Sequence, residues 1–174
     1  KVRLATKFMI GIIVLECLLM SATILIVENR MRDSILDEFR KHGLSVAKNL
    51  AAMNANYVAT YNYVNIEQNV EKIAAENGLA YATVLLFDGD VAAYSGSNDI
   101  KQEVLSDDIH NEALKASEVL IQYGRFTRTE EEFCDITVPI LMKGEKWGTV
   151  RVGFSLKDMH AAILKTRMVL FALG

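Results

Sequence analysis

The segment EFCDITVPILMKGEKWGTVRVGFSL, residues 132–156, has the most regular pattern in this 174-residue chain. Apolar residues occupy every second position of its first part: Cys134, Ile136, Val138, Ile140 and Met142. After a turn at residues 143–145, the return segment places Val150, Val152 and Phe154 on one face. This period of two predicts a pair of antiparallel strands. Pro139 has no backbone N–H to donate, so we expect an exposed edge or a bulge there.

The residues before this pair predict the rest of one sheet. The segment YATVLLFDGDVAAYSG, residues 81–96, holds two β-rich runs around an Asp-Gly-Asp turn and predicts a hairpin. A further strand is predicted over residues 118–127, with Ile121, Tyr123 and Arg125 on one face. Short helices are predicted over residues 65–78, with Asn65 as the N-cap, and over residues 106–117. Five strands with helices on one side indicate an α+β domain with an antiparallel five-stranded sheet.

An apolar segment near the start, FMIGIIVLECLLMSATILIV at residues 8–27, contains one charged residue, Glu16. Twenty helical residues extend about 30 Å, which is the thickness of a bilayer's hydrocarbon core. A signal peptide has a shorter apolar region, and a core helix that is apolar on every side needs a larger protein around it. We therefore expect a transmembrane helix. Lys1, Arg3 and Lys7 favour residues 1–7 as a cytoplasmic stub.

The chain becomes apolar again at residues 165–174. These residues are either a C-terminal core segment or, as we expect, the start of a second transmembrane helix. The predicted organisation is a transmembrane helix at residues 8–27, an extracytoplasmic domain at residues 28–164, and a truncated second membrane helix.

A long helix is predicted over residues 28–64, which contain no proline and one glycine. Residues on one stripe recur at 3-4 spacing: Leu36, Phe39, Gly43, Val46, Leu50, Met53, Tyr57, Thr60 and Val64. The stripe packs either in a coiled-coil-type dimer or on the domain's own sheet. Traced back in phase, it passes Ala22 and Gly11, with Glu16 beside it. In a dimer, Gly11 and Ala22 are therefore the expected contacts between membrane helices, and Glu16 flanks the seam.

Charge and motifs exclude several classes of function. Residues 28–164 hold 14 Lys and Arg against 21 Asp and Glu, whereas a nucleic-acid partner requires a basic stripe. Two distant cysteines and three scattered histidines predict neither a disulfide nor a metal site, and no cofactor is expected. There is no phosphate-binding glycine loop and no Gly-x-Ser-x-Gly motif. The carboxylate clusters at residues 107–108 and 130–132 lie in polar surroundings, so we do not expect this chain to be an enzyme.

Two segments resemble a known family, the extracytoplasmic single Cache (PAS-like) sensor domains of bacterial transmembrane receptors. LLFDGDVAAYSGS resembles the family's strand–turn–strand, and DITVPILMKGEKWGTVRVGFSLKDM resembles its closing hairpin. The matching positions in that hairpin are Pro139, Gly148, Val150, Val152, Gly153 and Ser155. The resemblance covers about residues 28–164, and the frame of two membrane helices agrees with it. The arginine-tryptophan-aspartate pattern of amino-acid-binding double Cache receptors is not seen, so the resemblance does not imply amino-acid recognition.

The resemblance implies a small-molecule pocket between the sheet and the segment after the first hairpin, residues 94–117 here. Tyr94, Tyr123 and Arg125 are the expected ligand-binding groups. Tyrosine offers a ring and a hydroxyl, and arginine binds a carboxylate through two parallel hydrogen bonds. Three alternatives stay open: ordinary sheet packing of the tyrosines, a surface position for Arg125, and a structural ion pair between Arg125 and Asp135.

The resemblance leads us to interpret the chain as the ligand-sensing input domain of a signal-transduction receptor, of histidine kinase, chemoreceptor or nucleotide cyclase type. We expect a homodimer in the inner membrane, with the sensor domain in the periplasm or outside the cell and a small molecule such as a carboxylate as its ligand. One alternative is a type IV pilin-like filament subunit, although Glu16 lies eight residues after Phe8 whereas the pilin glutamate lies four after the leading phenylalanine. The other is a membrane-anchored protein-interaction domain.

Overall fold

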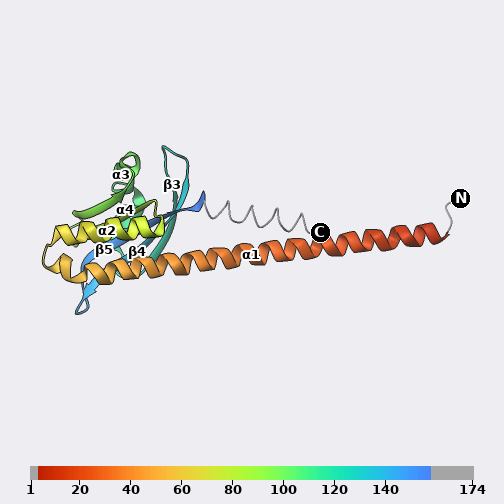
Figure 1. The fold of residues 1–174 in the computed structure, drawn as a ribbon, viewed down its shortest axis with the longest axis horizontal. Helices are drawn as coiled ribbons and strands as arrows, with labels where there is room; N and C mark the ends of the chain where they lie inside the picture. The colour runs from red at the N-terminus through yellow and green to blue at the C-terminus, as the bar shows by residue number, and fades with distance from the viewer. Residues whose placement is uncertain (1–3, 158–174) are drawn as a thin grey trace. The chain divides into compact units, whose positions relative to one another are not determined.

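The computed structural model describes residues 4–157 of the chain (Figure 1). The predicted second membrane segment at residues 165–174 lies outside these residues, as do the first three residues of the predicted stub. The described chain divides into two compact units, residues 4–38 and residues 39–157.

The first unit belongs to a single long helix, α1 (Leu4–Ala59). Its segment Met9–Val27 is long and apolar enough to cross a membrane, with a mean hydropathy of 2.6, and none of it is buried within the protein. The hydroxyls of Ser21 and Thr23 donate hydrogen bonds of 2.7 and 2.8 Å to carbonyl oxygens one turn earlier in the helix. Two of the polar groups in this segment therefore need no partner outside the helix.

The second unit is built on one antiparallel sheet of five strands, as the sequence predicts. The strands are β1 (Tyr81–Leu86), β2 (Val91–Gly96), β3 (Leu120–Arg125), β4 (Glu132–Met142) and β5 (Glu145–Ser155). Their order across the sheet is β2-β1-β5-β4-β3, so the closing pair β4 and β5 lies inside the sheet. Strand β4 pairs with β3 only as far as Thr137, and a bulge follows Ile140. Pro139 therefore lies beyond the reach of β3, so the edge of β4 is unpaired there as expected, but Pro139 itself is buried rather than exposed.

Helices α1 and α2 (Tyr63–Asn77) cover one face of the sheet. The buried α1 residues in this unit are Gly43, Val46, Ala47, Leu50, Ala51, Asn54 and Val58. At Gly43 the helix lies directly on the sheet, because a Cβ there would come within 2.5 Å of Ile136 Cδ1 and 2.8 Å of Phe154 Cε2. The predicted stripe thus packs on the domain's own sheet from Gly43 to Leu50.

The boundary between α1 and α2 differs from the prediction. Helix α1 ends at Ala59 rather than at residue 64, because Tyr61 adopts a left-handed backbone with φ 52°. Helix α2 begins three residues earlier than expected, since Asn62 is the N-cap and its side chain accepts a hydrogen bond of 3.3 Å from the Asn65 amide. Gly78 adopts the left-handed conformation and ends α2.

Two short helices, α3 (Asn98–Val104) and α4 (Asp108–Lys115), cover the other face of the sheet. The expectation that all helices lie on one side is therefore wrong, and Figure 1 shows α3 and α4 on the opposite side of the strands from α1. The sequence predicts a single helix at residues 106–117, whereas α3 precedes α4 here. Ser97 and Asp107 are the two N-caps. We call residues 97–116 the cover.

Candidate functional site

The sheet face beneath the cover is largely polar, in contrast to the apolar face beneath α1 and α2. Cross-strand register places three rows of residues on this face. One row is Tyr94, Thr83, Arg151, Thr137 and Leu120. The next row holds Gly96, Tyr81, Gly153, Asp135 and Gln122, and the third holds Leu85, Thr149 and Pro139. We call this the polar face. Polar side chains that are buried at the centre of a sheet require hydrogen-bond or ionic partners, either within the protein or from a ligand.

Arg151 lies at the centre of the polar face with a side chain that is 0% exposed. Its Nε donates to Asp135 Oδ2 at 3.0 Å, and Asp135 is also 0% exposed. Its Nη1 donates to the backbone oxygen of Val104 at 2.7 Å and to His110 Nδ1 at 3.1 Å. Its Nη2 donates to the Tyr81 hydroxyl at 3.3 Å. We call these five residues the Arg151 cluster.

The Arg151 cluster joins the sheet to both helices of the cover. Val104 is the last residue of α3, whose free carbonyls carry the negative end of the helix dipole. His110 lies in the first turn of α4, and the N-cap residue Asp107 approaches Arg151 Nη2 at 4.0 Å. One guanidinium therefore holds the end of α3 and the start of α4 against the sheet.

Electrostatics in the cluster follow from burial and from this single cation. Burial raises the pKa of Tyr81 well above its ordinary value, and the neighbouring Asp135 raises it further. Burial and then Arg151 lower the pKa of His110. Burial also raises the pKa of Asp107. The hydrogen bond from the His110 amide and the attraction of Arg151 lower this pKa, but burial has the larger effect. Tyr81 and His110 are therefore neutral near pH 7, and Asp135 is the buried counter-ion of Arg151.

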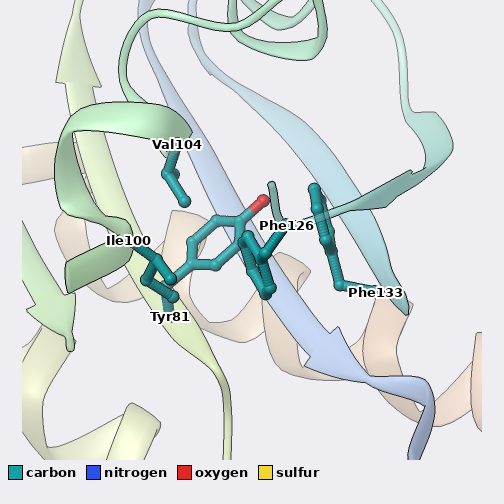
Figure 2. Close-up of a cluster of buried hydrophobic side chains, with 5 residues drawn as sticks. All are labelled: Tyr81, Ile100, Val104, Phe126 and Phe133. Carbon is teal, nitrogen blue, oxygen red and sulfur yellow. The ribbon is translucent and has the colours of Figure 1, made fainter. Parts of the chain in front are cut away.

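Tyr81 is also the centre of an apolar cluster, shown in Figure 2, with Ile100, Val104, Phe126 and Phe133. The ring lies between the α3 side chains and the two phenylalanines, and its hydroxyl points away from Ile100 (Figure 2). That hydroxyl donates to Asp135 Oδ2. The ring needs Gly153 beneath it, because a Cβ at that position would run into the ring. This cluster fixes the height of α3 above the polar face.

Hydrogen bonds to residues of a neighbouring loop and of β5 hold the rest of the cover in place. Glu103 of α3 accepts hydrogen bonds from the amide and hydroxyl of Thr127 at 2.5 and 2.7 Å. Lys146 Nζ donates to the backbone oxygens of Leu114 and Ala116, at 2.7 Å each, and so neutralises the C-terminal end of α4. These polar contacts hold the cover in addition to the apolar packing of Ile100 and Val104 around Tyr81.

Two polar atoms on this face are unpaired among the described residues. The Thr149 hydroxyl is fully buried, lies on the same face as Arg151 two residues earlier in β5, and has no hydrogen-bond partner there. The side-chain oxygen of Gln122, also on this face, is a second such atom. In contrast, Thr83 and Thr137 are both satisfied, by the Ala93 carbonyl and by Asp135. Buried hydroxyls without partners are uncommon, and this one points to a missing polar partner.

A surface hollow of about 360 Å³ lies at the end of α4 and the start of β3, between Glu112 and Leu120. It is lined by residues of both charges and lies outside the Arg151 cluster.

The predicted ligand-binding residues are not brought together. Tyr94 lies on the polar face, where its hydroxyl donates to the Ser97 carbonyl at 3.2 Å and burial raises its pKa to about 12. Tyr123 and Arg125 alternate to the other face of β3. There Tyr123 accepts a hydrogen bond of 2.7 Å from Arg40 of α1, and Arg125 pairs with Glu132 at 2.6 Å.

The ion pair considered between Arg125 and Asp135 is not formed. Asp135 faces the opposite side of the sheet, where it pairs with Arg151. Of the three predicted ligand-binding residues, Tyr94 alone shares a face with the Arg151 cluster.

The predicted membrane-helix residues Gly11, Glu16 and Ala22 all lie on the exposed surface of α1.

The residues that the sequence analysis missed are Arg151, Asp135, Tyr81 and Thr149. The signal for Asp135, Thr149 and Arg151 is a second alternation in β4 and β5, in which charged and hydroxyl residues interrupt apolar ones at period two. Tyr81 lies in β1 and has no such signal. His110, one of the three scattered histidines, was likewise not predicted as part of the site. Among the described residues there is no group of three or more metal-ligating side chains, and burial raises the pKa of the Cys134 thiol to about 11, so it is not a reactive thiolate.

Comparisons with known proteins agree with this fold. The family profile described as single Cache domain 3 matches residues 30–168. No curated protein matches the sequence. Two similar solved structures are chemoreceptor domains. The sensory domain of Campylobacter jejuni Tlp3 with isoleucine bound is 17% identical, with a TM-score of 0.62, over 83% of this chain and 64% of that one.

The second is the ligand-binding domain of the Pseudomonas aeruginosa PAO1 amino acid chemoreceptor PctC in complex with GABA, which is 14% identical, with a TM-score of 0.62 over 78% of this chain and 64% of that one. The chain thus spans less than two thirds of either chemoreceptor domain. The sensor domain of Escherichia coli DcuS is 18% identical, with a TM-score of 0.56 over 76% of this chain and 96% of that one. At these identities the structural likeness shows the fold, while the profile covers most of the chain: this protein belongs to the single Cache domain 3 family.

Proposed function

We propose that the chain is the ligand-sensing input domain of a bacterial membrane receptor, and that its ligand binds on the polar face beneath the cover. The observation that carries the proposal is Arg151, a fully buried cation whose donors hold the cover closed. A ligand oxygen can replace the Val104 carbonyl or His110 as acceptor, and the cover then moves. Family membership supports the sensing role, and it gives no support to the pilin alternative.

The ligand class follows from the cation at the centre of the site. A carboxylate accepts two parallel hydrogen bonds from a guanidinium. The ligands named for the two chemoreceptor structures, isoleucine and GABA, each carry a carboxylate. The hydroxyl of Thr149 supplies a further polar contact for a ligand beside Arg151. We therefore propose a small molecule with a carboxylate group, with Tyr94 at the margin of the site.

Tyr123 and Arg125 take a different role in this proposal. They lie on the α1 side of the sheet, where Tyr123 holds Arg40. A movement of β3 or β4 on ligand binding is passed to α1 through this face, including the close contact at Gly43. Ligand binding would thus shift a pre-existing equilibrium between two positions of α1.

The setting of the receptor is also part of the proposal. The apolar segment of α1 crosses the inner membrane, residues 1–7 are cytoplasmic, and residues 28–164 lie in the periplasm or outside the cell. Two copies pair through Gly11 and Ala22, with Glu16 at the flank of the seam, because a carboxylate in a bilayer is costly unless it faces protein or water. Residues 165–174 begin a second membrane helix, which leads to an output domain. We assign no catalytic step to this chain.

A ligand screen tests the proposal. The full chain in detergent micelles is screened by thermal shift against small carboxylates, amino acids, amines and neutral sugars at pH 7. We expect carboxylate-bearing compounds to stabilise the chain, and Thr149→Val to reduce that stabilisation. Stabilisation by neutral sugars alone, or stabilisation that Thr149→Val leaves unchanged, would contradict the proposed site.

A further inference from the structure

His110 closes the cover only in one protonation state. Arginine donates hydrogen bonds and does not accept them, so Arg151 Nη1, at 3.1 Å, donates to His110 Nδ1. The imidazole is therefore neutral in this arrangement and carries its proton on Nε2. A protonated imidazole has no acceptor and would place a second positive charge beside the guanidinium.

We propose that His110 is a proton-sensitive latch on the ligand site. Protonation breaks its contact with Arg151, loosens α4, and leaves Arg151 Nη1 with one acceptor fewer. A ligand carboxylate can then replace His110 as the acceptor for Arg151 Nη1. Binding of the carboxylate is thereby coupled to protonation of His110. The coupling to a carboxylate rests on the proposed function, whereas the latch itself does not.

The charged groups around His110 decide the sign of this coupling. From β5, Arg151 repels a protonated imidazole; from β4, Asp135 attracts it, but Asp135 is already bound by Arg151, Tyr81 and Thr137. Tyr81 of β1 is neutral. Asp107 accepts a hydrogen bond of 2.6 Å from the His110 amide and is on the same helix end.

Two further carboxylates are held by partners of their own. Glu103 of α3 binds Thr127, and Glu112 of α4 binds Gln122 of β3 at 2.5 Å. The direct contact with the guanidinium therefore prevails in the closed site. The lowered pKa of His110, caused by burial and then by Arg151, agrees with this balance.

Charge balance explains why a carboxylate and a proton enter together. Arg151 is neutralised by Asp135, and Asp107 adds a negative charge at 4.0 Å. A carboxylate alone would make the site more negative, and it would be opposed by both aspartates. A proton on His110 offsets the added charge and supplies a donor to the ligand. By linkage, lower pH then favours carboxylate binding as much as the carboxylate favours protonation.

The latch is tested without any ligand by hydrogen exchange. Exchange of the amides of residues 104–116 is measured in the full chain in detergent at pH 7.5 and pH 5.5, with each rate divided by the intrinsic rate at that pH. We expect opening of this segment to increase at the lower pH, by up to about tenfold between the two pH values, because the histidine of the open segment titrates near its ordinary pKa of about 6.5. His110→Gln, which keeps a side-chain acceptor for Arg151, should remove the increase.

His42→Gln is the matched control, because His42 is exposed on α1. Equal exchange at both pH values in the unaltered chain, or the same increase in His110→Gln, would overturn the latch.

Binding of acetate and succinate at the same two pH values tests the coupling. We expect tighter binding at pH 5.5, by up to about tenfold per pH unit for one proton taken up, and no such pH dependence in His110→Gln. Binding that does not vary with pH would overturn the coupling while leaving the proposed site in place. No binding of any carboxylate at either pH would contradict the proposed function, and the exchange result would still decide the latch.

Discussion

Arg151 Nη1 lies 2.7 Å from the backbone oxygen of Val104, which links the centre of the sheet to the last residue of α3. A guanidinium at a helix C-terminus meets free carbonyls and the negative end of the dipole. Because the same side chain also pairs with Asp135, the cover and the buried charge of the sheet depend on one residue.

Replacing Arg151 should destabilise the domain strongly. Arg151→Met leaves Asp135 buried without its cation, which costs about 3–5 kcal/mol of unfolding free energy. The matched control is Arg125→Met, because Arg125 is exposed and its pair with Glu132 contributes about 0–1 kcal/mol. Urea denaturation followed by circular dichroism measures both variants. The double variant Asp135→Leu with Arg151→Met should recover part of the loss, since it leaves no unpaired charge; a double variant less stable than Arg151→Met would count against the pairing.

Thr149→Val should not destabilise the free domain. The substitution keeps the shape of the side chain and removes a buried hydroxyl that has no partner among the described residues, so we expect a gain of up to about 1 kcal/mol. Thr83→Val and Thr137→Val are the matched controls, because both hydroxyls are hydrogen-bonded and their loss should destabilise the domain by about 1–3 kcal/mol. Thermal denaturation without ligand separates these outcomes. An equal loss in all three variants would mean that Thr149 is satisfied.

Gly43→Val should push α1 away from the sheet. The new side chain would begin 2.5 Å from Ile136 Cδ1, and overpacking of this kind typically costs about 1–3 kcal/mol. Ser45→Val, at an exposed position of the same helix, controls for the effect of a β-branched residue on helix stability. Unfolding curves of the two variants give the comparison. Equal stabilities would show that α1 does not rest on β4 and β5 at this point.

The pH dependence of stability should reflect His110. Its pKa is lower in the folded chain than its ordinary value of about 6.5, so the unfolded chain binds the proton more tightly. The stabilising contribution is therefore complete above about pH 7 and is lost as the pH falls through 6.5 toward the folded pKa. Asp107, whose pKa is raised, acts in the opposite direction at more acidic pH. The melting temperature of His110→Gln should change less between pH 7.5 and 5.5 than that of His42→Gln, and equal changes would be the contrary result.

The membrane helices should pair along Gly11 and Ala22. In a Cys17→Ala background, single cysteines at positions 11 and 22 are expected to cross-link between copies in native membranes. Ile13 and Met20 lie about 180° around the helix from these positions and serve as controls. Cross-linking is measured by non-reducing electrophoresis after mild oxidation. Stronger cross-linking at positions 13 and 20 would place the seam on the other face of the helix.

The strands could be predicted from the sequence because their alternation is local. Apolar residues at period two mark β4 and β5, and the Asp-Gly-Asp turn marks the β1–β2 hairpin. Helix α3 could not be predicted as readily, because it has seven residues and only Ile100 and Val104 are buried. Its N-cap Ser97 is a weak signal when no longer apolar stripe follows.

The site could not be predicted from the sequence for a related reason. In an antiparallel sheet with one solvated face, polar residues that alternate with apolar ones are expected to point to water. Asp135 and Arg151 follow that pattern, and they are buried because α3 and α4 cover the second face. They become neighbours through the pairing of β4 with β5, 16 residues apart in the chain. Tyr123 and Arg125 were correctly placed together on one face, but it is the face that holds α1.

The most direct test of the account is a ligand footprint. The full chain in detergent is exposed to the carboxylate that stabilises it most, and hydrogen exchange is compared with and without that compound. The account predicts a change in exchange that is concentrated in residues 97–116 and in β5 around Arg151, and that Thr149→Val weakens. A footprint confined to α1 and α2, with no change in the cover, would contradict the claim that the ligand binds on the polar face.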